Sequence, residues 1–191
     1  MREELSPLPT TSYAVLGLLS FGEALSGYEI RKWAENMRFF YWSPAQSQIY
    51  SELRRLSDRG YVEPSEVAQT GKPDKRLYAI TAAGEAELSR WLAEEENEPT
   101  VMKHGVALKL YFGHMTSPDV LAEMLERFVD ECREMMGQLA VVQEFMEDDP
   151  RFARAALVTE WGYQHYSNEV EMARKLLGRL TEEQETTDLD G

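Results

Sequence analysis

Apolar positions in the first ninety residues recur at helical spacing in three successive segments. Residues three or four apart lie on the same side of an α-helix, so this spacing is typical of helices that bury one face. Ser26 and Glu29 have the spacing of a capping box, which marks the start of the second segment. The pattern therefore predicts helices over residues 10–21, 27–37 and 43–58.

The third predicted helix has clear ends. Ser43 suits the N-cap, Pro44 suits the first helical position, and Gln46 completes a second capping box. Gly60 lies just past the last turn, where glycine commonly ends a helix. One face of this helix carries the apolar side chains Ala45, Ile49, Leu53 and Leu56.

The opposite face of this helix is polar, but it is not the usual mixture of glutamate and lysine. It carries hydroxyls, amides, a tyrosine and arginines, which can hydrogen-bond to base edges or phosphates in a DNA groove. An ordinary solvated face is the alternative interpretation. The candidate DNA-binding residues on this helix are Gln46, Ser47, Tyr50, Ser51, Arg54 and Arg55.

After the third helix the pattern changes from helical to extended. Two short pieces on either side of Pro64 and an alternating run over residues 75–80 predict strands. Residues 69–74 between them have the composition of a turn. The sequence therefore predicts a β-hairpin whose tip and return strand carry the cations Lys72, Lys75 and Arg76.

A fourth helix, over residues 81–92, completes the order of a winged helix-turn-helix. In that arrangement the third helix enters the major groove of DNA, and the wing cations reach phosphates or the neighbouring minor groove. A structural ribbon with solvent-facing lysines is the alternative for the hairpin. Residues 1–93 are therefore predicted to form a DNA-binding domain.

A charged break over residues 94–99 leads into a helical second half. After a short helix over residues 101–112, two long helices carry apolar residues at alternating steps of four and three, which is a heptad pattern. Because such a hairpin has few places to bury both seams, we expect it to pack against a second copy of the chain. The predicted dimer interface comprises Leu121, Leu125, Phe128, Met135, Leu139, Val170, Leu177 and Leu180.

The predicted fold is mainly α with a small β-hairpin wing. The N-terminal winged helix-turn-helix is followed by an antiparallel long-helix dimerisation domain over residues 100–180. Residues 181–191 are polar and acidic and follow no periodic pattern, so they are predicted to form a disordered tail.

The net charge of −14 is unusual for a protein that binds nucleic acid, but the charge is unevenly distributed. Residues 1–92 carry 11 Lys and Arg against 12 Asp and Glu, whereas residues 93–191 carry 9 against 22. The acidity therefore belongs to the second half. Attraction to DNA phosphates must come from a few local cations in the first half.

The remaining composition argues against several other classes of protein. No apolar run is long enough to span a membrane, and the first residues lack an apolar signal region, so we expect a cytoplasmic protein. Cys132 is the only cysteine and the three histidines show no ligand spacing, so neither a metal site nor a cofactor is expected. No arrangement of nucleophile and base is evident, and we expect no catalysis.

Aromatic residues offer a possible effector pocket, because flat aromatic ligands stack on such side chains. The alternative is that these residues fill the core and the dimer interface. The candidates are Phe40, Trp42, Trp161, Tyr163 and Tyr166.

Five blocks of the first half resemble the winged-helix domain of PadR-type transcriptional regulators. In the second half, Lys109-Leu110-Tyr111-Phe112-Gly113 is similar to the C-terminal helical domain of the larger PadR subgroup. The five blocks are Tyr13-Ala14-Val15-Leu16-Gly17-Leu18-Leu19, Ser26-Gly27-Tyr28-Glu29-Ile30, the run from Ser47 to Leu56, Gly60-Tyr61-Val62, and the run from Arg76 to Gly84.

The resemblance implies a homodimeric repressor that binds an inverted-repeat operator in double-stranded DNA and releases it when an effector binds. On matching positions it places Tyr50, Ser51 and Arg54 in the major groove and the three cations of the hairpin in the wing. Effectors of the family include phenolic acids and other aromatic compounds. The alternative function is a protein-interaction adaptor that uses the winged helix as a docking module, which the acidic charge favours.

Overall fold

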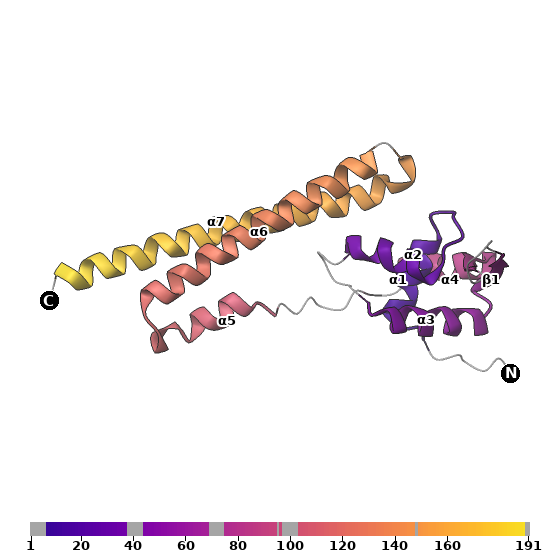
Figure 1. Ribbon diagram of the computed structural model, residues 1–191, viewed down its shortest axis with the longest axis horizontal. Coiled ribbons are helices and arrows are strands. Elements are labelled where there is room, and N and C mark those ends of the chain that lie inside the picture. Colours follow the sequence, from indigo (N-terminus) through magenta and orange to yellow (C-terminus); the bar gives the residue numbers. More distant parts are fainter. Residues whose placement is uncertain are drawn as a thin grey trace. The chain divides into compact units, whose positions relative to one another are not determined.

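The chain divides into two compact units, Met1–Glu98 and Pro99–Gly191, in a computed structural model (Figure 1). The structure describes residues 7–37, 44–68, 75–94, 96, 103–147 and 149–189. The described part of the N-terminal unit contains, in order, α1 (Thr10–Leu19), α2 (Gly27–Ala34), the 3-10 turn η1 (Glu35–Met37), α3 (Gln46–Asp58), β1 (Val62–Val67), β2 (Lys75–Ile80) and α4 (Ala82–Glu94).

The start of α2 confirms the capping box predicted from the sequence. The Ser26 hydroxyl accepts a hydrogen bond from the Glu29 amide at 3.3 Å, and the Glu29 carboxylate accepts one from the Ser26 amide at 2.9 Å. Two N–H groups that the helix itself cannot satisfy are thereby paired. This local pairing explains why two residues three apart were enough to predict the start of α2.

The predicted capping box of α3 is wrong. The helix begins at Gln46, and its N-cap is Ala45, which has an extended backbone (φ −63°, ψ 149°) and no side chain that could cap. Pro44 is buried, so it anchors the approach to the helix and does not form its first turn. Ser43 lies outside the described residues.

The end of α3 follows the prediction. Gly60 has φ +71°, a left-handed conformation that glycine adopts without a steric penalty. The amide of Tyr61 donates to the Leu56 carbonyl at 2.9 Å, and that of Gly60 donates to the Ser57 carbonyl at 2.9 Å. These two bonds form a Schellman motif, which satisfies the last carbonyls of the helix.

The wing is a two-stranded antiparallel sheet, and the predicted interruption at Pro64 is absent. Pro64 lies within β1, opposite Tyr78 of β2. The backbone N–H and C=O of Tyr78 are bonded to Leu25 on the other side of the strand, at 2.9 and 3.0 Å. The Pro64–Tyr78 pair therefore needs no ladder hydrogen bond, and the missing N–H of proline costs nothing there.

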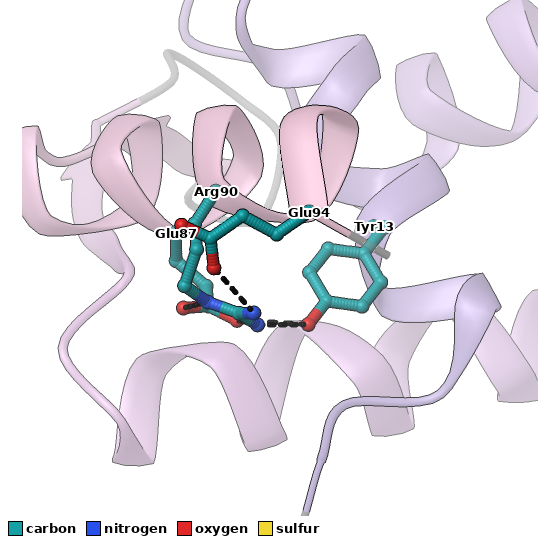
Figure 2. A network of polar contacts seen from close by, with 4 residues as sticks. All are labelled: Tyr13, Glu87, Arg90 and Glu94. Atoms are coloured by element: carbon teal, nitrogen blue, oxygen red, sulfur yellow. Dashed lines mark hydrogen bonds and ion pairs between the residues drawn. The ribbon is translucent and has the colours of Figure 1, made fainter. Parts of the chain in front are cut away.

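The core of the N-terminal unit is built from side chains of its helices and of the wing. Helix α4 packs on α1 through Tyr13, whose ring stacks on Trp91 at a centroid distance of 4.6 Å. Figure 2 shows the polar end of this contact: the Tyr13 hydroxyl donates to Glu87 at 2.8 Å and accepts from Arg90 at 3.3 Å. Hydrogen bonding from Arg90 lowers the pKa of Glu87 despite partial burial. The fully buried hydrophobic residues include Val15, Leu16, Ile30, Ile49, Leu53 and Leu56.

The C-terminal unit is a long helical hairpin with a short helix before it. Helices α6 and α7 lie side by side and antiparallel along most of their length (Figure 1). The described elements are α5 (Gly105–Tyr111), η2 (Gly113–Met115), α6 (Pro118–Glu147), η3 (Pro150–Phe152) and α7 (Ala153–Leu189).

The start of α5 is held by His104, which the sequence analysis did not single out as a cap. Its ring nitrogen Nδ1 accepts a hydrogen bond from the Ala107 amide at 3.1 Å, and Nε2 lies 3.1 Å from a Glu169 oxygen. The imidazole thereby ties the short helix to α7. Helix α5 begins at Gly105, later than the predicted start at residue 101.

The last helix is longer than the sequence predicts. Helix α7 continues to Leu189, so residues 181–189 are helical where a disordered tail is expected. Glutamate and glutamine in this stretch are good helix formers, and a helix that is already nucleated extends at little cost. Periodicity in apolar positions cannot predict such an extension, because the stretch is almost entirely polar. Within the described part of the chain, no helix is both long and apolar enough to cross a membrane.

Candidate nucleic-acid interface

Helix α3 presents its polar face to solvent, as the sequence predicts. Its other side is anchored in the core by Ile49, Leu53 and Leu56, each fully buried. Because the helix is fixed on one side and straight for thirteen residues, its exposed side chains project from one rigid support. The exposed residues include all six candidates: Gln46, Ser47, Tyr50, Ser51, Arg54 and Arg55.

An open groove runs along one flank of α3 and is shared with the start of α2 and with β2. Its lining combines aromatic and cationic side chains, which can contact a phosphate backbone, with the carboxylates Glu29 and Asp58. The residues that line it include Tyr28 and Lys32 of α2, Tyr50 and Arg54 of α3, and Lys75 and Arg76 of β2.

Tyr50 is positioned by a close approach between α3 and α2. A Cβ atom at Gly27 would lie 2.6 Å from a ring carbon of Tyr50, which is closer than side chains tolerate. A larger residue at Gly27 would therefore displace the Tyr50 ring from this position. The ring is held over the first turn of α2, with its exposed side in the groove.

The wing cations differ in their surroundings. Lys75 pairs with Glu29 at 2.9 Å, and this hydrogen bond is the main reason why the pKa of Glu29 falls to about 2. The pair links β2 to the capped start of α2. Arg76 is exposed and lies 5.6 Å from the centroid of the Tyr78 ring. Lys72 lies outside the described residues.

Arg54 and Arg55 lie on different flanks of α3. Arg54 lines the groove with α2 and the wing. Arg55 turns back along its own helix to Glu52, with Nε 3.2 Å from the carboxylate. Consecutive residues on a helix are about 100° apart, so the two arginines reach different regions of any molecule docked on α3.

Sequence reasoning missed two residues of this surface, Tyr28 and Lys32. Both are exposed on α2 and line the groove. Their spacing of four places them on one side of the helix, and Tyr28 lies between the two residues of the capping box, Ser26 and Glu29. That spacing was visible in the sequence, but which side of α2 faces the groove depends on how α2 packs against α3.

The effector candidates on α7 do not form one enclosed site in the C-terminal unit. Trp161 is 72 % exposed and Tyr163 is exposed, and two residues apart on a helix they point about 200° away from each other. Tyr166 is half-buried; burial raises the pKa of its hydroxyl, and the neighbouring Cys132 and Glu169 add to the effect. Phe40 and Trp42 lie outside the described residues.

Part of the predicted dimer seam is buried within the single chain. Leu125 and Leu139 are 1 % exposed, so they offer no surface to a second copy. Heptad periodicity identified the buried faces of α6 and α7 but could not say which helix covers them. Leu121 is also buried, whereas the remaining seam residues are partly buried: Phe128, Met135, Val170, Leu177 and Leu180.

Cys132 is buried on α6, and burial raises the pKa of its thiol to about 11. The thiol is therefore protonated at neutral pH and is a poor nucleophile. Among the residues that the structure describes, no group of three His, Cys, Asp or Glu side chains could hold a metal ion.

Two family models together cover most of the chain. Residues 15–90 match the transcriptional regulator PadR-like family, and residues 102–181 match the virulence activator alpha C-terminal domain. The first match covers the winged helix and the second covers α5, α6 and most of α7.

Individual relatives agree with these matches. The chain is 34 % identical to the negative transcriptional regulator PadR of Bacillus subtilis over 131 residues, which is 69 % of this chain and 70 % of that protein. The crystal structure of Bacillus subtilis PadR in complex with operator DNA superposes with a TM-score of 0.80 at 28 % identity, covering 90 % of this chain and 99 % of the other. The same protein in complex with p-coumaric acid gives a TM-score of 0.72 at 27 % identity, covering 91 % and 99 %.

The winged helix, the long helical hairpin and the sequence matches agree in both halves of the molecule. The chain therefore belongs to the PadR-like family of transcriptional regulators, which are not enzymes.

Proposed function

We propose that this protein is a repressor that binds an inverted-repeat operator as a homodimer. The observation that carries the proposal is the exposed polar face of α3, next to a groove that is lined by cations and aromatic rings from three elements. Such a face can hydrogen-bond to base edges, while Lys32, Arg54 and Arg76 attract phosphates. The similar Bacillus subtilis protein is a negative regulator that binds operator DNA. The protein would act in the cytoplasm, where its operator lies.

A homodimer suits the acidic character of the chain. With few cations in each copy, one winged helix would bind DNA weakly, and two linked copies reading two half-sites would bind much more tightly. The C-terminal unit offers an apolar surface for this contact, because several large side chains on α5, η2 and the start of α6 are exposed. They are Leu108, Tyr111, Phe112, Met115 and Val120.

We also propose that a small aromatic effector releases the operator. Support comes from the Bacillus subtilis relative, which binds p-coumaric acid, a phenolic acid. In this chain, Trp161, Tyr163 and Tyr166 stay candidates for stacking on such a ring. Because Trp161 and Tyr163 point apart on α7, the site would also need side chains from other elements. Binding would shift the separation of the two recognition helices away from the spacing of the half-sites.

Selection of bound sequences from random double-stranded DNA tests the proposal directly. We expect an enriched inverted repeat whose half-sites lie a whole number of helical turns apart. Fluorescence anisotropy with the selected sequence should show binding that weakens with salt and survives competitor DNA. Addition of p-coumaric acid or another phenolic acid should release the DNA. Absence of any enriched sequence at low salt would instead favour a protein-interaction adaptor.

Arg54→Ala tests the assignment of the recognition face. Loss of one base or phosphate contact by Arg54 should weaken operator binding by about 1–3 kcal/mol without changing the oligomeric state. Arg133→Ala is the matched control, because it removes the same charge from an exposed position on α6. Equal affinities of the two variants for the operator would show that this face of α3 does not read DNA.

A further inference from the structure

Glu52 is the unusual residue of α3. It lies on the same side of the helix as Ile49, Leu53 and Leu56, and it is only 5 % exposed. A carboxylate in such a place loses most of its hydration, which is costly unless charged and hydrogen-bonding partners replace the water. An apolar residue at this position would stabilise the core at least as well. The presence of a carboxylate therefore calls for a role other than core packing.

Two partners satisfy this carboxylate, and both contact the same oxygen. The hydroxyl of Ser12, which is fully buried on α1, donates to Oε2 of Glu52. Nε of Arg55 lies 3.2 Å from that oxygen. Ser12 fixes the position of the carboxylate relative to the core, and the carboxylate in turn fixes the guanidinium. Arg55 is thereby connected through Glu52 to Ser12 of α1, which precedes Glu52 by forty residues in the chain.

The other end of Arg55 points outward. Its side chain is 46 % exposed, and the ion pair with Glu52 runs through Nε, so it does not engage the four N–H groups at the end of the guanidinium. The remaining donors can form the planar fork that binds a guanine edge or a phosphate through two parallel hydrogen bonds. A guanidinium that is already held in one orientation loses less conformational freedom when it makes those bonds.

We infer that Glu52 is a positioning residue for DNA recognition, which holds Arg55 in a fixed orientation at the edge of α3. The inference rests on the proposed function, since it requires that α3 reads DNA. It assigns different roles to the two neighbouring arginines. Arg54 acts from the groove, whereas Arg55 acts as a preoriented contact on a different flank of α3. It also gives Ser12, which lies inside the core, an indirect part in operator binding.

The first test uses Glu52→Gln, which keeps an acceptor for Ser12 but removes the charge that holds Arg55. We expect operator affinity to fall roughly ten-fold while affinity for non-specific DNA stays equal or rises, because the variant is less negative. Glu63→Gln is the matched control, since it removes the same charge from an exposed position on β1. Equal ratios of operator to non-specific affinity in the two variants would overturn the inference.

The second test uses Arg55→Lys, an exposed substitution that does not threaten folding. Lysine keeps the charge but lacks the fork, so it cannot contact Glu52 and DNA at once. We expect its ratio of operator to non-specific affinity to fall as far as that of Arg55→Ala. A wild-type ratio in Arg55→Lys would overturn the inference, even if Glu52→Gln does not fold.

A double variant shows whether Glu52 acts through Arg55. In the Arg55→Ala background, Glu52→Gln should cause no further loss of operator affinity. A further ten-fold loss would mean that Glu52 affects DNA binding by another route, against the inference. If the wild-type chain selects no DNA sequence, the proposed function fails and this inference fails with it. If wild type prefers an operator and neither variant changes the ratio, only this inference fails.

Discussion

The two units of this protein bury their apolar residues in different ways. In the N-terminal unit, helices α1, α2 and α3 surround a core whose central residues have no exposed surface. In the C-terminal unit, the buried cluster is a narrow line between α6 and α7, and large apolar side chains remain on the outside. Tyr111 and Met115, for example, are about 80 % exposed.

This difference supports the proposed homodimer, in which a second copy of the chain would cover the exposed apolar side chains of the C-terminal unit. Exposed apolar patches on a folded chain commonly mark protein–protein contacts. The charge follows the same division, because the second half carries nearly all of the net negative charge. The uneven charge supports the proposal that the N-terminal unit approaches DNA and that the C-terminal unit pairs with a second copy.

The largest expected effect is in the N-terminal core. Leu53→Ala removes a fully buried side chain of α3 and should destabilise this unit by about 3 kcal/mol, with loss of DNA binding. Thermal or urea unfolding followed by circular dichroism measures the change. Leu92→Ala, at an exposed position of α4, should change the stability by less than about 0.5 kcal/mol. Similar effects of the two substitutions would contradict the buried core described here.

The next effect concerns the apolar surface of the C-terminal unit. Tyr111→Glu places a charge in the proposed dimer contact and should shift the protein from dimer to monomer in light scattering, because a desolvated charge without a partner is costly. Operator affinity should fall at least ten-fold with the loss of the second half-site. Thr116→Glu adds the same charge at an exposed polar position nearby and should leave the dimer intact. If the Tyr111→Glu variant stays dimeric, the dimer interface does not include Tyr111.

A smaller effect is expected for the contact between α1 and α4 in Figure 2. Tyr13→Phe removes the hydroxyl that joins Glu87 and Arg90, while those two residues still pair with each other. The loss of stability should be about 1 kcal/mol. Tyr28→Phe removes an exposed hydroxyl from the same unit and should leave the stability unchanged. The same unfolding measurement compares the two variants.

The smallest effect concerns the link between the wing and α2, and it depends on pH. The folded state lowers the pKa of Glu29 from 4.5 to about 2, so ionised Glu29 stabilises the fold above pH 4.5 and this contribution is lost as the pH falls towards 2. The stability difference between wild type and Glu29→Gln should therefore shrink over that range. Both partners are about one-third exposed, so the difference should also fall with salt. A difference that is independent of pH would refute this role of the ion pair.

Patterns within single segments were enough for much of this fold. The capping box at Ser26, the end of α3 at Gly60 and the polar face of α3 all depend on residues within a few positions of one another. Errors arose where distant segments decide the outcome. Pro44 was expected to start α3, but it is buried and precedes the helix. Pro64 was expected to interrupt β1, but the bonds between Tyr78 and Leu25 make its missing N–H harmless.

The candidate site shows the same limit. Its arginines and its tyrosine were recognisable from their spacing on α3, but their partners were not. Glu29 meets Lys75 forty-six residues later, and Glu52 meets Ser12 forty residues earlier. The heptad steps identified the buried faces of α6 and α7, but the structure pairs these faces within one chain.

The sequence by itself determined the helices, the wing, the exposed face of α3 and the acidic second half, because periodicity, capping and charge are properties of neighbouring residues. Only the tertiary structure decided how Arg54 and Arg55 differ and which cation of the wing is paired. It also decided which apolar residues of the hairpin remain on the surface. The physical reason is that a side chain's partners are set by packing between segments far apart in the chain, and no local pattern records them.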